Sequence, residues 1–189
     1  MSFFPQFSLS LLNGVIPFGL YLLVFGITMS TFNKDVRARL YEKGIATKKQ
    51  VAFFVITKLI ALVNIITILF SRLVFGNICF IVGTVVYVLG LSVFIISLIT
   101  YSKTSLDKPV RDGIYKLSRN PQMIGIWSIF IGIGFMIGSV ATLLLLTVGI
   151  ITSHQSTLAE EQFCLRAYGS EYERYMREVP RYIFIKTKF

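Results

Sequence analysis

Apolar residues gather in five runs along the 189-residue chain, with polar residues between them. Three runs, residues 9–32, 51–70 and 77–100, have the length of a membrane-crossing helix, which needs about 20 mostly apolar residues. Two shorter runs, 123–139 and 140–153, almost touch, and we expect them to form a tight helical hairpin that turns near Gly138 and Ser139. The pattern predicts an all-α integral membrane protein with about five transmembrane helices, a cytoplasmic linker and a C-terminal helical tail.

The shortness of the last two runs leaves a second arrangement open. A re-entrant hairpin, which enters and leaves the membrane on one face, places its ends on the same side as two complete crossings do. In either case small residues allow close helix packing. We therefore expect Gly125, Gly132 and Gly134 to let the hairpin pack against its neighbours.

Charged residues lie almost entirely in three segments outside the apolar runs. Residues 33–50, 101–120 and 159–189 hold 6, 5 and 6 Lys or Arg, which leaves only Lys58 and Arg72 of the 19, and they hold all 9 acidic residues. With five crossings these segments share one face of the membrane, and the excess of basic residues predicts that this face is cytoplasmic. The N-terminus of this multi-pass protein is then outside, and the C-terminus is cytoplasmic.

Composition agrees with a membrane protein and limits its chemistry. The chain is 54% hydrophobic and 15% charged, with a mean hydropathy of +0.72, which is too apolar for an ordinary soluble domain. The net charge of +10 is typical of basic loops beside anionic lipids, so we expect membrane lipids rather than nucleic acid as partners. Two separate cysteines and one histidine indicate no metal site. Because no basic leader precedes the first run, we expect that run to be retained.

Two parts with different roles are expected. Residues 1–106 hold the first three helices and face the lipid and the substrate, whereas residues 107–189 hold the linker, the hairpin and the tail. Aromatic residues recur at helical spacing in 159–179, which is typical of a helix lying on the bilayer surface with its tyrosines at the interface. Gly169 is a candidate break in that helix.

Two polar clusters flank the hairpin on its cytoplasmic side, where polar groups beside an apolar bundle are functional candidates. The linker end holds Arg111, Gly113, Tyr115, Arg119, Asn120 and Pro121. The inner end of the fifth run holds His154, Gln155, Glu160 and Glu161. Each residue alone has an ordinary explanation: Asn120 caps a helix that begins with Pro121, Tyr115 is an interfacial anchor, and the glutamates form solvated ion pairs.

The order of these residues is more specific than any one of them. Gly-x-Tyr is followed by Arg-Asn-Pro-x-x-x-Gly, the hairpin, Glu-Glu, Tyr-Gly and Val-Pro-Arg. Over residues 107–183 the chain resembles the isoprenylcysteine carboxyl methyltransferase and phospholipid methyltransferase family of integral membrane enzymes. The family usually has histidine, tyrosine and a basic residue where this chain has Asn120, Met123 and Ser156.

The resemblance implies S-adenosylmethionine as cofactor, bound at the cytoplasmic mouth, and a lipophilic substrate that enters from the bilayer. The cofactor-binding candidates are Gly113, Tyr115, Arg119, Asn120, Pro121, Gly125, Glu160 and Glu161, and the catalytic candidates are Arg119, Glu161, His154 and Tyr115. A glutamate can balance the sulfonium and ammonium groups, and Arg119 can meet the carboxylate. An amine acceptor would require loss of a proton, whereas a carboxylate would not; the sequence leaves carboxylate, amine and thiol open.

Two other functions stay open, as does the oligomeric state. Membrane sterol or steroid reductases that use NADPH share a related C-terminal arrangement, although the Arg-Asn-Pro stretch and the Val-Pro-Arg tail favour the methyltransferases. A non-catalytic membrane scaffold would account for Met123 and Ser156.

Overall fold

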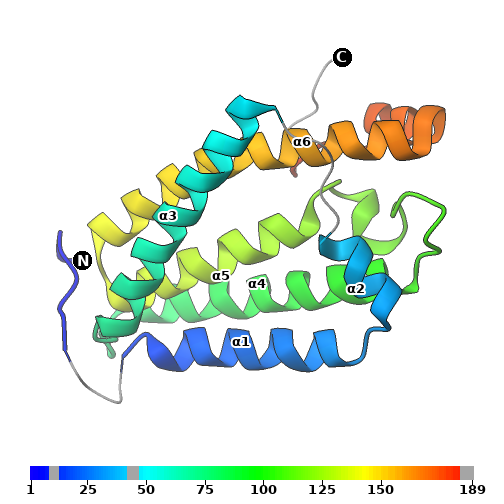
Figure 1. The fold of residues 1–189 in the computed structure, drawn as a ribbon. Coiled ribbons are helices and arrows are strands. Elements are labelled where there is room, and N and C mark those ends of the chain that lie inside the picture. Colours follow the sequence, from blue (N-terminus) through cyan, green and yellow to red (C-terminus); the bar gives the residue numbers. More distant parts are fainter. Residues whose placement is uncertain (9–12, 42–46, 184–189) are drawn as a thin grey trace.

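The computed structural model describes residues 1–8, 13–41 and 47–183, and within these ranges the chain is helical and forms no strand (Figure 1). The elements are α1 (Val15–Ser30), α2 (Lys34–Tyr41), α3 (Lys48–Phe70), α4 (Ile78–Lys103), the 3-10 helix η1 (Gly113–Lys116), α5 (Pro121–Ile137) and α6 (Val140–Glu178). The expected all-α class is confirmed.

Three helices, α3, α4 and α6, are long and apolar enough to cross a membrane. Helices α1 and α5 are apolar but have only 16 and 17 residues. At 1.5 Å per residue such helices fall short of a hydrocarbon core about 30 Å thick. The expected first run, 9–32, gives a helix only from Val15 to Ser30, and residues 9–12 lie outside the described part. Five crossings, rather than three and a re-entrant hairpin, stays a prediction.

The turn between α5 and α6 lies where the sequence predicts it. Gly138 ends α5 with a φ of 69°, a left-handed conformation that suits glycine, and the Ser139 hydroxyl accepts a hydrogen bond of 3.2 Å from the Thr142 amide. Beyond this turn the two helices diverge, because α5 packs mainly along α4 and α6 mainly along α3 (Figure 1). The hairpin is therefore tight at its turn only.

Glycines bring α4 and α5 together over most of their length. A Cβ atom on Gly132 would lie 2.6 Å from the Gly83 carbonyl oxygen, and one on Gly125 would lie 2.8 Å from the Phe94 amide nitrogen. On Gly134 it would lie 2.6 Å from the Leu143 side chain of α6. The predicted packing role of the three hairpin glycines is confirmed, and the α4–α5 contact is close enough to exclude side chains.

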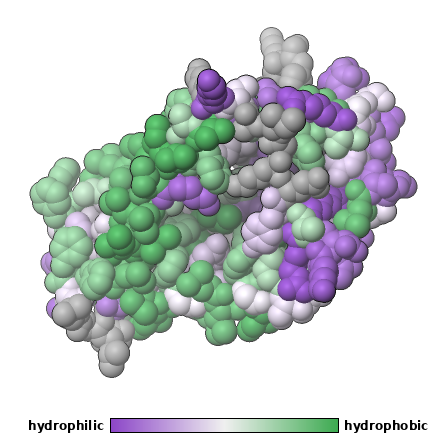
Figure 2. Space-filling view, viewed as in Figure 1, coloured by the Kyte–Doolittle hydropathy of each residue, from purple (hydrophilic) through white to green (hydrophobic). Residues whose placement is uncertain are grey.

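Charged segments gather at one end of the molecule, where α2, the linker after α4 and the second half of α6 lie (Figures 1 and 2). Apolar side chains cover most of the rest of the face shown in Figure 2. The opposite end is closed by the N-terminal residues: the Ser2 amide donates to the Gly138 carbonyl at 2.9 Å, and the Val140 amide donates to the Ser2 carbonyl at 3.0 Å. The orientation of these ends in the membrane stays a prediction.

The fifth run continues as a helix into the tail as far as Tyr168, and a second helical segment follows Gly169; α6 comprises both segments. Its backbone breaks at Gly169, as predicted, with φ 54° and ψ −132°. Beyond the break, Tyr172 and Tyr175 are buried within the protein. The expectation that these tyrosines lie at the bilayer interface is wrong, because they pack against the protein's own polar end: the Tyr175 hydroxyl donates to the Tyr115 carbonyl at 2.7 Å.

We predict that Gly132→Ala destabilises the protein, because the added methyl group meets backbone atoms that cannot rotate away. Overpacking of this kind typically costs about 1–3 kcal/mol. The matched control is Gly19→Ala in α1, where a Cβ meets nothing within 4 Å. Thermal unfolding in detergent should give a lower midpoint for Gly132→Ala only; equal midpoints would show that the α4–α5 contact is looser than described.

Candidate functional site

The Arg-Asn-Pro stretch lies at the start of α5. Pro121 is the first residue of the helix, as predicted, and Asn120 is at the N-cap position. The Asn120 side chain makes no capping hydrogen bond and donates instead to the Arg181 carbonyl at 3.2 Å. The expected asparagine cap is therefore wrong, and within the described part of the chain no side chain caps the first turn of α5.

The guanidinium of Arg119 is buried in a dense set of polar contacts. It approaches Glu161 Oε1 with Nε at 3.0 Å and Nη2 at 2.9 Å, and its Nη1 donates to the carbonyls of Met176 at 2.6 Å and Val179 at 2.8 Å. Arg181 donates to Glu161 Oε2 from Nε at 2.9 Å and from Nη2 at 2.7 Å. We call Arg119, Glu161 and Arg181 the ionic cluster.

The ionic cluster carries two positive charges and one negative charge. Buried charges are costly unless they are paired and hydrogen-bonded. Both oxygens of Glu161 accept hydrogen bonds, and the carbonyls that Arg119 contacts lie at the C-terminal end of α6, which attracts cations. The carboxylate of Glu161 and these two carbonyls therefore offset the positive charge of the buried guanidinium groups.

Hydrogen bonds to backbone carbonyls of the Val-Pro-Arg tail join the tail to the Arg-Asn-Pro stretch. The Arg119 amide donates to the Pro180 carbonyl at 3.0 Å, and the Ser118 hydroxyl donates to the Arg181 carbonyl at 2.9 Å. Two stretches that the sequence separates by about sixty residues are thus one structural unit.

Tyr115 lies in η1 and is buried. Its hydroxyl accepts a hydrogen bond of 2.9 Å from Nε2 of the Gln122 side chain. Burial raises the pKa of Tyr115 well above that of a free tyrosine, because the phenolate is poorly solvated there. At neutral pH the side chain is a neutral phenol, which donates a hydrogen bond more readily than it removes a proton.

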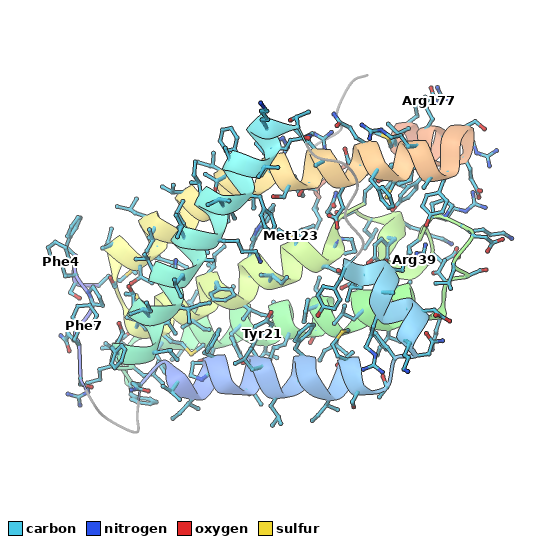
Figure 3. All side chains as sticks on the ribbon, viewed as in Figure 1. Phe4, Phe7, Tyr21, Arg39, Met123 and Arg177 are labelled. Atoms are coloured by element: carbon cyan, nitrogen blue, oxygen red, sulfur yellow. The ribbon has the colours of Figure 1, made fainter. Side chains whose placement is uncertain are left out.

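A cavity of about 650 Å³ opens beside the ionic cluster, between α2, the end of α4, the linker, the start of α5 and the middle of α6. Six of the predicted site residues line it: Tyr115, Arg119, Asn120, Pro121, Glu160 and Glu161. Met123 on α5 and Arg39 on α2, both labelled in Figure 3, also belong to its walls. The structure therefore brings part of each predicted polar cluster to one cavity.

Three predicted site residues do not line this cavity. Gly113, with φ 54°, lies near Thr100, and Gly125 faces α4. His154 Nδ1 is 3.1 Å from the Tyr182 hydroxyl, on a side of α6 outside the cavity lining. Their part in a site stays a prediction.

Sequence reasoning missed the contribution of the N-terminal half. Helix α2 supplies Asp35, Ala38, Arg39 and Leu40, and α4 supplies Tyr101. The cavity thus has walls on both sides of the expected boundary at residue 106. The sequence does contain an indication of α2. Val36 and Leu40 are apolar and four residues apart within a basic segment, which predicts a short amphipathic helix.

The cavity wall is acidic, although the protein as a whole is basic. Its charged residues are Asp35, Arg39, Asp107, Arg119, Glu160 and Glu161. The lining has four carboxylates and two guanidinium groups, and Arg181, which binds Glu161, adds a third guanidinium, so the cavity and the ionic cluster together carry a formal charge of −1, whereas the chain carries +10. A cationic ligand is therefore favoured here, and a strongly anionic one is disfavoured.

Comparison with known proteins identifies one family. A family model described as phospholipid methyltransferase matches residues 71–171, which are 101 of the 189 residues. The matched segment contains α4, the linker, α5 and α6 as far as residue 171, and it excludes α2 and the Val-Pro-Arg tail. No curated protein and no solved structure matches the chain.

We predict that Glu161→Gln is strongly destabilising, because it removes the carboxylate charge that binds both buried guanidinium groups. Breaking a buried ion pair from one side typically costs about 3–5 kcal/mol. The control is Glu173→Gln, whose partner Arg177 is exposed, and it should cost less than about 1 kcal/mol. Unfolding midpoints in detergent measure both variants; a small effect at Glu161 would contradict the structural role of the ionic cluster.

Proposed function

The chain belongs to the phospholipid methyltransferase family of membrane methyltransferases, and on that premise we propose that it transfers a methyl group from S-adenosylmethionine to a lipophilic acceptor. In this proposal the cavity beside the ionic cluster holds the cofactor, and the acceptor reaches it from the bilayer. The observation that carries the proposal is the acidic lining of the cavity.

The residues of the cavity suit this cofactor in size and charge. Its volume of about 650 Å³ lies within the range of roughly 300–1,000 Å³ that is usual for small-molecule sites. S-adenosylmethionine has two positive groups and one carboxylate, so its net charge of about +1 complements the lining. Glu160 would face the positive groups, and the uncapped amides at the start of α5 would serve the carboxylate, as helix N-termini do for anions.

Arg119 takes a different part from the one that the sequence suggests. Its nitrogens already contact Glu161 and two carbonyls, so we assign it to positioning rather than to direct contact with the carboxylate. By joining the start of α5 to α6, Arg119 and Glu161 would keep the α5 amides and Glu160 at one mouth.

When bound, S-adenosylmethionine supplies an electrophilic methyl group for in-line displacement. The chain's own tasks are then alignment and exclusion of water. Tyr115, as a neutral phenol, can donate a hydrogen bond to the acceptor. Glu160, one of the four carboxylates of the lining, could take a proton from an amine acceptor, whereas a carboxylate acceptor would need no base.

A reductase is less compatible with this cavity. A nicotinamide dinucleotide carries several phosphate charges, which the acidic lining repels. A scaffold without a ligand would have no need of an acidic cavity of this size.

The function can be tested on the purified full chain in detergent or lipid. We expect S-adenosylmethionine to bind, NADPH not to bind, and labelled methyl to be transferred to a component of total membrane lipids or to a prenylcysteine analogue. Binding of NADPH alone would support the reductase, and binding of neither compound would support the scaffold.

We predict that Glu160→Gln weakens binding of S-adenosylmethionine by roughly three- to tenfold, because one carboxylate near its positive groups is lost. S-adenosylhomocysteine lacks the sulfonium charge, so its affinity should fall less. Calorimetric titration of both compounds measures the difference. Glu171→Gln is the matched control, since Glu171 pairs with Arg111 and is not part of the cavity lining; equal losses for both compounds would rule out recognition of the sulfonium by Glu160.

A further inference from the structure

Arg39 of α2 joins three segments around the cavity that lie far apart in the sequence. Its Nη1 donates to the carbonyls of Thr104 at 3.4 Å and Ser105 at 3.0 Å. Its Nη2 donates to the Lys108 carbonyl at 2.5 Å and to the Tyr168 hydroxyl at 3.1 Å. One side chain thus connects α2, the linker after α4, and α6.

The chemistry of these contacts requires arginine. Thr104 caps the C-terminus of α4, where carbonyls lack helical partners and attract a cation. The guanidinium also lies 5.0 Å from the ring centre of Tyr101 and 5.9 Å from that of Tyr168. A planar group with several fixed donors can serve all of these acceptors at once, whereas the single ammonium of lysine cannot.

Helix α2 has few other anchors. It is only 8 residues long, and its apolar contacts with the core come from Val36, which is buried, and Leu40, which is partly buried. Asp35, Ala38 and Leu40 line the cavity together with Arg39, and in Figure 1 α2 lies against the polar end of the bundle. The position of this wall therefore depends largely on the Arg39 contacts.

We propose that Arg39 is a positioning residue that fastens α2 across the cavity and so encloses the bound ligand. Arg39 and all of α2 lie outside the segment 71–171 that the family model matches. The identity of the ligand rests on the proposed function, but the closure of the cavity by Arg39 does not.

Cys164 provides a reporter of this closure, since it lines the cavity and the chain has only one other cysteine, Cys79. In a Cys79→Ser background, the rate at which a maleimide modifies Cys164 measures access to the cavity. We expect Arg39→Ala to raise this rate roughly tenfold, which corresponds to the loss of about one hydrogen bond to a charged group. Arg39→Lys should raise it less.

The matched control is Arg37→Ala, which removes the same charge from an exposed position of the same helix. This variant should leave the rate unchanged. Tyr168→Phe removes one acceptor of Arg39 and keeps every charge, so it should raise the rate by roughly two- to threefold, and it tests the proposal even where Arg39→Ala fails to fold. An unchanged rate in Arg39→Ala and Tyr168→Phe, or an equal rise in Arg37→Ala, would overturn the proposal.

Kinetics separate a positioning role from general destabilisation. Arg39→Ala should raise KM for S-adenosylmethionine roughly tenfold, with kcat changed by less than about twofold, because binding is weakened without loss of a reacting group. A loss of kcat alone would contradict this role. A further comparison uses the Cys79→Ser protein with Arg39 intact. If S-adenosylmethionine does not slow maleimide modification of Cys164 there, while Arg39→Ala still speeds it, closure by Arg39 stands and the proposed function is wrong.

Discussion

The buried contact of Glu161 with Arg119 and Arg181 fixes the geometry of the polar end. Each carboxylate oxygen is bound by a different arginine, so the start of α5, the middle of α6 and the tail must meet at one point. Arg119 also requires the carbonyls of Met176 and Val179, which lie beyond the break in α6. The positive φ of Gly169 allows the last part of α6 to turn back toward α5 (Figure 1), and a side chain there would strain the backbone.

The apolar part of the molecule supplies the second half of this arrangement. Because glycines bind α5 to α4 while α6 follows α3, the two helices separate from a single turn at Gly138. The space that opens between them at the polar end is where the tail lies: Tyr182 packs against Trp127 of α5, with ring centres 4.9 Å apart, and contacts His154 of α6. The divergence in the apolar region thus leaves room for the ionic cluster and for the cavity beside it.

Hydropathy predicted the helices, and turn-forming residues predicted the bend at Gly138 and Ser139, because both are local properties. The position of both polar clusters at the same end of one hairpin also predicted that Asn120 and Glu160 lie near each other. The partners of Arg119 could not be predicted, since an arginine that binds a ligand and one that pairs with a distant glutamate look the same in sequence. Helix α2 escaped recognition for a similar reason: eight residues within a basic segment resemble a cytoplasmic loop, and tertiary contacts, those of Arg39 among them, place them over the cavity.

Two of the three departures from the family pattern, Asn120 and Met123, have different physical consequences. The contact of residue 120 with the Arg181 carbonyl requires only a hydrogen-bond donor. Both an asparagine amide and the histidine ring usual in the family can donate, so the asparagine of this chain can retain the contact with the tail. Met123 lies in the cavity wall together with Ile126; a methionine there presents a flexible apolar surface without the hydroxyl of tyrosine. Asparagine at position 120 thus keeps the hydrogen bond between the start of α5 and the tail. Methionine at position 123 makes the α5 side of the cavity more apolar, in contrast to the carboxylates on α2 and α6. A site with one charged side and one apolar side suits the proposed pairing of a cationic cofactor with a lipophilic acceptor.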